Sequence, residues 1–395
     1  MKKYALSVSV SDKELCFLIE GRIDSSSIRD FGDSVLAERR KYPHGRIVFD
    51  CRELEYISSA GLRVLLSLKK KERAPIRLIN VSPDVHETLD VTGFSRLLEV
   101  FKTPRDLSDA EVQKMGYSGN ITVYRMGEDT LLKVYPEGTN LDAIEQERQF
   151  AQAAFLSGVP TLIAYDVVTY KGQYAMLYEL VKATTVASLI DATPWKMDQY
   201  AAEMGKLLKT IHKAVPEPGI LPKTSAIYDG WARRMSPWLY SQEIEKLCRL
   251  IHVIPESETV VYGNFHPRNV FLQHGEPLLI NMAGISCGNP VFDLGAIYMT
   301  HTAEVEQLLQ HPTLKTIQAK KFWDVMIRVY FGTTDPNIIK KREDVIQAAA
   351  MLRSVLSPAA TPMSGEEAEP YIAQARRDLL PATDYLAALL STARF

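Results

Sequence analysis

The sequence predicts two consecutive domains, an α/β domain with a mixed sheet and an α+β domain with a small β-rich lobe and a large helical lobe. Residues 1–105 alternate short apolar strands with amphipathic helices across short connections. Residues 116–395 begin with strands and become mainly helical after residue 181. A chain of 395 residues is also long enough for more than one hydrophobic core.

The first domain is expected to open with a β-hairpin. Residues 4–22 alternate in polarity and break at Ser11-Asp12-Lys13, which is typical of two strands joined by a tight turn. The next expected elements are a helix over 27–42, a nearly all-apolar strand over 46–51, a helix capped by Ser58, a strand over 76–81, a short helix closed by Gly93 and an edge strand.

The second domain is expected to follow a polar linker over 106–115. Its small lobe, residues 116–181, contains a predicted hairpin around Gly127-Glu128-Asp129 and an amphipathic helix over 141–156. Two further strands meet at Lys171-Gly172. Residues 182–395 are then expected to form the large helical lobe.

Composition excludes several functional classes. The formal net charge of −2 gives no electrostatic basis for binding nucleic acid or an anionic membrane. No apolar run approaches the ~20 residues that span a bilayer, and Asp12 interrupts the N-terminal run too early for a signal peptide. The four cysteines lack metal-ligand spacing. We therefore expect a soluble cytoplasmic protein with reduced thiols and neither nucleic-acid nor membrane partners.

The motifs of the first domain surround its second expected helix. They are GRIDSSS (21–27), FDCRELEYISSAGLRVLL (49–66) and LINVSPDVHETLDVTGFSRLLEVF (78–101). Residues 1–105 resemble the STAS domain of anti-sigma factor antagonists. The resemblance implies a protein partner, such as a switch kinase or another anti-sigma regulator, and loss of binding when a Ser or Thr at this helix start is phosphorylated. Free N–H groups and the helix dipole would favour a phosphate there.

This helix start departs from the family pattern. Family members often have Asp-Ser-Ser-Gly-Leu or Asp-Ser-Thr-Gly-Leu, whereas residues 58–62 are SSAGL. By alignment, Ser59 is the first candidate phosphoacceptor and Ser58 the second, with Asp24 as a neighbour. Alternatively, Ser58 only caps the helix and Ser59 is an ordinary residue of the first turn.

The second domain carries five motifs in a characteristic order. They are LLKVY (131–135), ELVKATTVASL (179–189), MGKLLKTIH (204–212), YGNFHPRNV (262–270) and LLINMAGISCGNPVFDLG (278–295). Their order and spacing resemble the aminoglycoside phosphotransferase and choline kinase branch of the protein-kinase-like fold, over roughly residues 115–395. The resemblance implies ATP and magnesium as cofactors and a small molecule in the cleft.

The resemblance assigns roles to residues of the small lobe. Lys133 is the strand lysine that would contact the ATP phosphates, and Glu147 is its expected partner on the helix. Glu145 remains an alternative, because two acids two residues apart point to different sides of a helix. In the phosphate-covering loop, only Gly116 of the glycine pattern is kept, and Ser118 stands where glycine would permit close backbone approach. Ile121 occupies another such position.

The resemblance also assigns roles in the large lobe. Asn264 stands where a catalytic Asp would accept the substrate proton, Asn269 where an Asn binds magnesium, and Asn281 where the main metal-binding Asp would be. Asp293 and His266 match positions that brace the catalytic loop. Tyr262 replaces the His that usually begins this loop.

These departures favour a pseudokinase. Asn264 cannot accept a proton at neutral pH, and general-base catalysis is worth about 10²–10⁴-fold. Asn269 and Asn281 would bring no negative charge to a hard cation that prefers carboxylates. We therefore expect ATP and magnesium binding to be weak or lost.

Two functional hypotheses remain open. In the first, the protein is a signalling module whose STAS domain binds a regulatory partner and whose kinase-like domain is a sensor or binding platform. In the second, it is an active ATP-dependent phosphotransferase of a small molecule or a protein, because Lys133 and Asn269 persist and substrate phosphates can hold a metal. Deliberate replacement of the acids at 264 and 281 is a third interpretation, against which Tyr262 and the altered loop argue.

Overall fold

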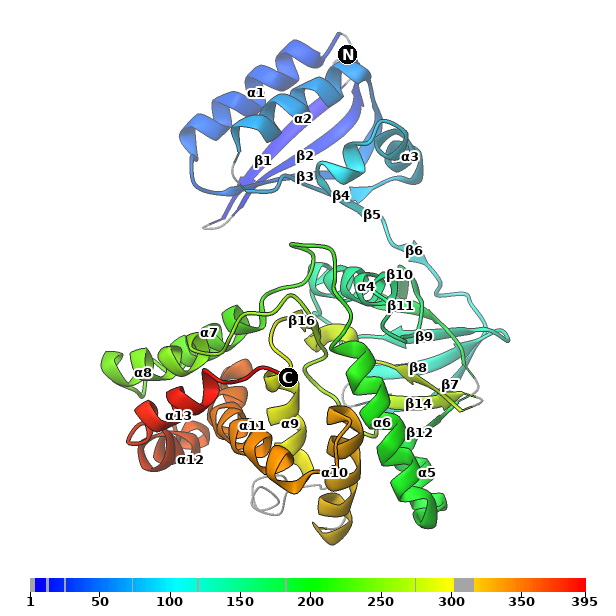
Figure 1. The fold of residues 1–395 in the computed structure, drawn as a ribbon. Coiled ribbons are helices and arrows are strands. Elements are labelled where there is room, and N and C mark those ends of the chain that lie inside the picture. Colours follow the sequence, from blue (N-terminus) through cyan, green and yellow to red (C-terminus); the bar gives the residue numbers. More distant parts are fainter. Residues whose placement is uncertain are drawn as a thin grey trace. The chain divides into compact units, whose positions relative to one another are not determined.

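The computed structural model describes residues 4–11, 14–24, 26–72, 74–118, 121–181, 183–273, 275–301 and 316–395. The chain divides into two compact units, which we describe separately (Figure 1). The first unit comprises Met1–Asp109 with Val167–Tyr174, and the second comprises Ala110–Asp166 with Ala175–Phe395.

The first unit is built on a five-stranded sheet of order β1-β2-β3-β4-β5. Only the β1–β2 pair is antiparallel among these pairings, as expected for the opening hairpin. The strands are β1 (Tyr4–Val10), β2 (Glu14–Ile23), β3 (Arg46–Ile57), β4 (Arg77–Val81) and β5 (Glu99–Lys102). The helices are α1 (Ile28–Lys41), α2 (Ser59–Lys71) and α3 (Pro83–Val91).

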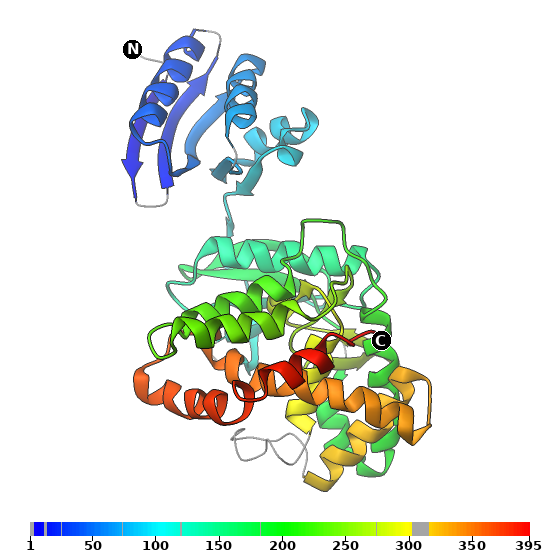
Figure 2. The same ribbon diagram turned by 60° about the vertical axis from the view of Figure 1, so that its left-hand side comes forward.

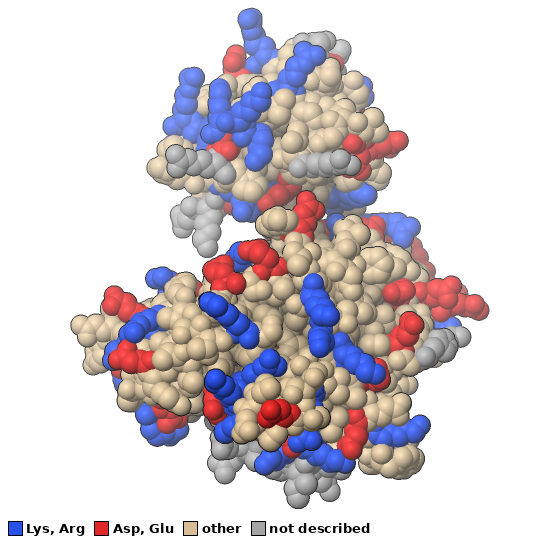
Figure 3. Space-filling view, viewed as in Figure 1, with Lys and Arg blue, Asp and Glu red and all other residues tan. Residues whose placement is uncertain are grey.

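The core of the first unit follows the predicted periodicity. Alternate residues of β2 are buried, among them Leu15, Phe17 and Ile19. Helices α1 and α2 lie side by side over the sheet and contribute Phe31 and Leu65 to the same core (Figure 2). These two helices end in basic residues, Arg39, Arg40 and Lys41 in α1 and Lys69, Lys70 and Lys71 in α2. Figure 3 shows Lys and Arg side chains gathered on this face. The negative end of each helix dipole stabilises positive charges at the helix C-terminus.

Strand β3 is longer than the expected strand over 46–51. Its residues after Cys51 are mostly polar and exposed, yet they continue to pair with β2 up to Arg22↔Tyr56 and Ile23↔Ile57. Backbone pairing extends the strand where side-chain polarity alone indicates a loop.

A second sheet has the order β6-β10-β11-β9-β8-β7 and is described together with helix α4; β6 and most of β10 are assigned to the first unit, and the other strands and α4 form the small lobe. The elements are β6 (Arg105–Asp106), β7 (Val112–Ser118), β8 (Ile121–Met126), β9 (Thr130–Val134), α4 (Leu141–Leu156), β10 (Ala164–Tyr170) and β11 (Gln173–Glu179). The predicted hairpin is present as β8 and β9, which pair from Met126↔Thr130. Residues 106–115, predicted as a linker, include the start of β7, because Val112 already pairs with Met126.

The large lobe is mainly helical. Its helices are α5 (Val186–Ala192), α6 (Met197–Ile211), α7 (Thr224–Arg234), α8 (Ser241–His252), α9 (Val291–His301), α10 (Thr316–Phe331), α11 (Pro336–Leu356), α12 (Gly365–Gln374) and α13 (Thr383–Leu390). Short strands lie between them, namely β12 (Thr184–Thr185), β13 (Val260–Val261), β14 (Val270–Gln273), β15 (Glu276–Leu279) and β16 (Ser286–Cys287).

Glycine permits close packing of two helix pairs in this lobe. A Cβ on Gly205 of α6 would lie 2.5 Å from the carbonyl oxygen of Met326 in α10. A Cβ on Gly295 of α9 would lie 2.9 Å from the backbone of Ala349 in α11. In the part of the chain that the structure describes, no helix is both long and apolar enough to cross a membrane.

Candidate functional site

A cavity of about 400 Å³ lies in the second unit. Its walls are mainly apolar side chains of the small-lobe strands and of β14, together with the segment that follows β15. Its apolar lining includes Met115, Val123, Leu131, Leu180, Phe271 and Met282. Lys133 and Asn281, two predicted site residues from different lobes, also line it. A mostly apolar cavity with a few convergent polar groups is typical of small-molecule sites.

Lys133 is paired with Glu147, as expected from the sequence. The Lys133 Nζ lies 2.6 Å from Glu147 Oε1, and both residues are buried. The hydroxyls of Tyr135 and Tyr178 donate to the same carboxylate, at 2.8 and 3.3 Å. Burial raises the pKa of both phenols, so they remain protonated donors. Together, the ammonium and two hydroxyls satisfy a buried carboxylate that would otherwise be costly.

The alternative partner, Glu145, has another contact. Its Oε2 accepts a hydrogen bond from Arg148 Nε at 2.7 Å, one turn further along α4. Of the two acids, Glu147 is therefore the one that contacts Lys133.

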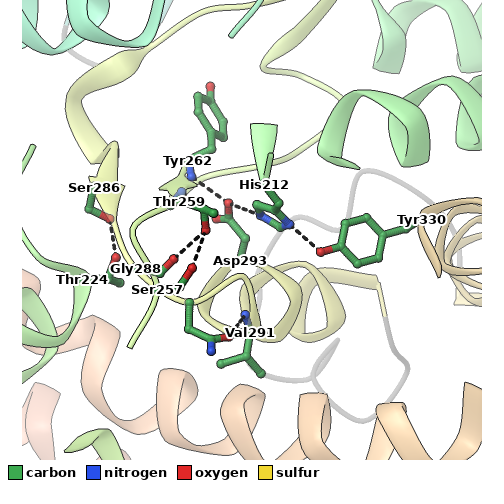
Figure 4. Close-up of polar contacts among 12 residues, drawn as sticks. His212, Thr224, Ser257, Thr259, Tyr262, Ser286, Gly288, Val291, Asp293 and Tyr330 are labelled. Carbon is green, nitrogen blue, oxygen red and sulfur yellow. Dashed lines mark hydrogen bonds and ion pairs between the residues drawn. The ribbon is translucent and has the colours of Figure 1, made fainter. Parts of the chain in front are cut away.

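Residues 262–270, which match the family's catalytic loop and are called the catalytic-loop segment below, are held by Asp293 at the start of α9 (Figure 4). This fully buried carboxylate accepts hydrogen bonds from the backbone N–H groups of Tyr262 and Gly263, at 2.7 and 2.6 Å. His212 Nε2 lies 3.1 Å from the carboxylate, and His212 Nδ1 lies 2.8 Å from the Tyr330 hydroxyl. Asp293 thus contacts the loop backbone, which is the bracing position that the sequence predicts.

Two further features shape this segment. Gly263 has a φ of +82°, and a Cβ there would lie 2.4 Å from the carbonyl oxygen of Gly284. The Tyr262 hydroxyl donates to the carbonyl of Ile280, the residue before Asn281. Tyr262 therefore ties the loop to the segment that carries Asn281.

The three predicted asparagines form a chain of amide contacts. Asn281 Nδ2 donates to Asn269 Oδ1 at 3.3 Å, and Asn269 Nδ2 donates to the backbone oxygen of Asn264 at 2.9 Å. Asn281 has a φ of +61°, a left-handed conformation that Asn tolerates better than most residues. The Asn264 side chain is exposed.

This arrangement does not fit a magnesium site. The oxygen of Asn269 already accepts a hydrogen bond from Asn281, and both side chains are neutral. Among the described residues, no group of three or more His, Cys, Asp or Glu side chains is placed to hold a metal ion. Since Mg²⁺ depends on carboxylate and phosphate oxygens, this chain supplies little of what the ion needs.

The remaining predicted residues of the second unit lie apart from these contacts. Gly116 lies within β7, at an irregularity in its pairing with β8, and a Cβ there would have open space around it. Ser118 ends β7, Ile121 lines the cavity, and loop residues 119–120 lie outside the described residues. His266 Nδ1 accepts a hydrogen bond from the backbone of Arg268 at 3.2 Å.

In the first unit, Ser58 caps α2 as predicted. Its Oγ accepts a hydrogen bond from the Gly61 N–H at 3.3 Å, and its own N–H donates to Ile23 O at 2.8 Å. Ser59, the first residue of α2, is exposed. The neighbouring Asp24 carboxylate accepts hydrogen bonds from Ser26, at 2.9 Å from its N–H and 2.5 Å from its hydroxyl.

Some residues of these sites carry no sequence signal that reveals them. In the sequence, Tyr135 and Tyr178 look like ordinary strand residues. The one weak signal is that Tyr135 lies only two residues from Lys133, close enough in sequence for its hydroxyl to share the partner of Lys133. Arg353, whose Nη2 donates to the Gly263 carbonyl at 3.2 Å, lies 90 residues further along the chain.

Two family models match the chain. The STAS domain model matches residues 5–107, and the phosphotransferase enzyme family model matches residues 115–314. A STAS-domain containing protein of Pseudomonas aeruginosa is 35% identical over 95 residues, which cover 23% of this chain and 92% of that protein. BtrV of Bordetella bronchiseptica, named among anti-sigma factor antagonists, is 31% identical over 98 residues, 24% of this chain and 84% of that protein.

Solved structures with similarity to the chain include two kinds of kinase. A choline/ethanolamine kinase family protein from Mesorhizobium loti has a TM-score of 0.46 and 14% identity, covering 72% of this chain and 94% of that chain. The ADP-bound aminoglycoside phosphotransferase APH(2'')-Ib has a TM-score of 0.46 and 12% identity, covering 68% of this chain and 92% of that chain.

Proposed function

This chain belongs to the phosphotransferase enzyme family and begins with a STAS domain, and we propose that it is a signalling protein. We further propose that it lacks phosphotransferase activity, because amides stand where the metal ligands and the proton acceptor are expected. In this proposal, the STAS domain binds a regulatory protein, and the kinase-like domain binds a small molecule as a sensor or binding platform. Its four free cysteines suit a reducing compartment, and we expect the protein to act in the cytoplasm.

One observation carries the proposal for the kinase-like domain. The side chains at 269 and 281, where metal ligands are expected, are neutral amides that hydrogen-bond to each other. The side chain at 264, where the proton acceptor is expected, is also an amide. Phosphoryl transfer depends on charge neutralisation by metal ions and on positioning of the nucleophile. The apolar cavity and Lys133 would still allow a ligand to bind.

An active phosphotransferase is the second candidate. The intact pair between Lys133 and Glu147 favours it, because this lysine is the group expected to contact ATP phosphates. Substrate phosphates would then have to supply nearly all the negative charge around magnesium.

Calorimetry with ATP, with and without MgCl₂, and a phosphate-release assay test the proposal on the full chain. We expect weak ATP binding that magnesium does not strengthen, and no phosphate release above buffer. Turnover on the usual kinase scale of ~1–100 s⁻¹ would establish the second candidate instead.

For the STAS domain, we propose a switch kinase or an anti-sigma factor-like protein as partner and Ser59 as the regulated residue. The relatedness to BtrV supports the class of partner. The exposure of Ser59 at the start of α2 supports the site, since a phosphate there would lie at the positive end of the helix dipole. The capping hydrogen bond assigns Ser58 a structural role.

Substitutions at the two serines separate regulation from capping. Ser58→Ala should lower the free energy of unfolding by about 1 kcal/mol, whereas Ser59→Ala should leave it unchanged. Ser59→Asp should fold normally and lose a partner protein that Ser59→Ala retains, as measured by pull-down alongside thermal melts. If Ser59→Asp retains every partner of Ser59→Ala, the helix start is only a cap.

A further inference from the structure

A second cavity, of about 190 Å³, lies beside the catalytic-loop segment. It is formed by α7, α11 and the backbone of residues 283–284, and Gly263 contributes to its wall. No described residue lines both this cavity and the larger one. The volume far exceeds the roughly 10–15 Å³ that one water molecule requires, so a small organic ligand is the relevant occupant.

A guanidinium group faces this cavity without a carboxylate partner. Arg353 of α11 donates from Nη1 to the Tyr228 hydroxyl at 3.0 Å and from Nη2 to the Gly263 carbonyl at 3.2 Å. Among the described residues, no carboxylate lies within ion-pair distance of it. These two bonds use two of its five N–H donors. The buried Asp293 carboxylate acts on the guanidinium only through space and already accepts hydrogen bonds from the Tyr262 and Gly263 N–H groups, so an anion in direct contact with Arg353 would still be favoured.

Aromatic side chains line the same cavity. The Tyr228 and Trp231 rings are 4.7 Å apart between centroids, and the Tyr228 and Phe292 rings are 4.6 Å apart. The guanidinium carbon of Arg353 lies 5.1 Å from the Trp231 centroid and 5.7 Å from the Tyr228 centroid. Because these ring faces already attract Arg353, a second cation would gain little from them and would be repelled by it.

A pair of hydroxyls adds a further donor. Thr224 Oγ1 and Ser286 Oγ, both buried and both lining the cavity, are 2.8 Å apart (Figure 4). Two hydroxyls that share one hydrogen bond leave a second hydroxyl hydrogen free. Among the described residues, neither hydroxyl makes another hydrogen bond, so this hydrogen can be donated to a ligand.

We propose that this cavity binds a small planar or aromatic molecule that carries a carboxylate or a phosphate group. Arg353 is the counter-ion of the anionic group, since guanidinium matches the geometry of both oxyanions. The rings of Trp231 and Phe292 contact the planar part. The inference rests on the proposed sensing function and names the class of ligand sensed.

The position of Arg353 connects this ligand to the catalytic-loop segment. The guanidinium that pairs with the anion also holds the carbonyl of Gly263, next to Asn264. An occupied cavity therefore restrains the hydrogen bond that positions this segment.

The first test uses the unmodified full chain and four probes of similar size. Phenyl phosphate, benzoate, phenol and benzylamine are compared by calorimetry and by thermal melts at constant ionic strength. We expect phenyl phosphate or benzoate to bind and raise the melting temperature, and phenol and benzylamine to bind at least about tenfold more weakly. Equal binding of the anionic, neutral and cationic probes would overturn the proposal.

Three variants then locate the anion. Arg353→Gln keeps an amide donor for Gly263 but removes the charge, and it should weaken binding of the anionic probe at least about tenfold. Arg342→Gln is the matched control, because Arg342 lies on the same helix and also stacks on a ring, that of Phe331 at 4.4 Å, away from the cavity. Lys133→Met removes the cation of the larger cavity. Arg342→Gln should stay within about twofold of the wild type. So should Lys133→Met when binding is measured well below its lowered melting temperature, because Lys133 does not line this cavity.

The outcomes separate this inference from the proposed function. If Lys133→Met abolishes anion binding and Arg353→Gln does not, the anion binds in the larger cavity and the inference is wrong. Phosphate release from ATP would contradict the proposed function but not the assignment of Arg353. Should Arg353→Gln fail to fold, the probe comparison on the unmodified chain still decides whether an anion is preferred.

Discussion

On the small-lobe side of the larger cavity, the lining residue Lys133 belongs to a buried ion pair, whereas on the large-lobe side the lining residue Asn281 contacts another neutral amide. Lys133 and Glu147 lie 2.6 Å apart, with two tyrosine hydroxyls completing the carboxylate's contacts. Asn269 and Asn281 contact each other through an uncharged hydrogen bond of 3.3 Å. Nearby, Asp293 keeps a full set of hydrogen bonds to the catalytic-loop backbone.

The difference shows which positions of this domain carry charged side chains and which carry neutral ones. Charged groups remain where they hold the fold together, as Asp293 and Glu147 do. At the positions expected to face a metal ion and a substrate hydroxyl, amides of the same size stand instead. An amide has nearly the same size as the carboxylate expected there, so these side chains fit the fold without supplying its charge.

The largest expected effect comes from breaking the ion pair. Lys133→Met leaves the buried Glu147 carboxylate without a cation, and we expect the free energy of unfolding to fall by about 3–5 kcal/mol. Chemical denaturation measures it. The control is Lys206→Met on α6, which removes the partner of Glu203 in an exposed pair and should cost no more than about 0.5 kcal/mol. A neutral effect of Lys133→Met would show that the two tyrosine hydroxyls alone satisfy Glu147.

A smaller effect is expected from charging the amide side. Asn281→Asp removes the donor to Asn269 and places two acceptors face to face, so stability without metal should fall by about 1 kcal/mol. With MgCl₂ and ATP, the new carboxylate should strengthen nucleotide binding at least about tenfold. Calorimetry and melts with and without MgCl₂ measure both effects. If magnesium changes neither the stability nor the nucleotide binding of Asn281→Asp, then the missing carboxylate is not the only reason why the cleft fails to bind magnesium.

The smallest expected effect is that of Asn264→Asp. This side chain is exposed, so the free energy of unfolding should change by less than about 0.5 kcal/mol, with or without magnesium. Its carboxylate would act only on a bound substrate. Phosphate release should therefore appear, if at all, only in the double variant with Asn281→Asp. Activity of Asn264→Asp alone would show that the large-lobe residues can hold magnesium without a carboxylate.

Several elements and contacts were predictable because their signals are local. The cap at Ser58 depends on residues within one helical turn. That Lys133 pairs with an acid on the next helix was predictable from the resemblance, although the choice between Glu147 and Glu145 was not. Strand β3 beyond Cys51 and the start of β7 at Val112 were missed, because partner strands and not their own side chains define them.

The sequence by itself determined the two-domain order, the helices and strands with clear periodicity, and the absence of acids at 264 and 281. Those properties depend on residue identity and on neighbours a few positions away. Only the tertiary structure decided that Glu147 rather than Glu145 contacts Lys133, that Asn281 hydrogen-bonds to Asn269, and that Arg353 reaches Gly263. Such contacts depend on how distant segments pack, and no local pattern encodes the distance between them.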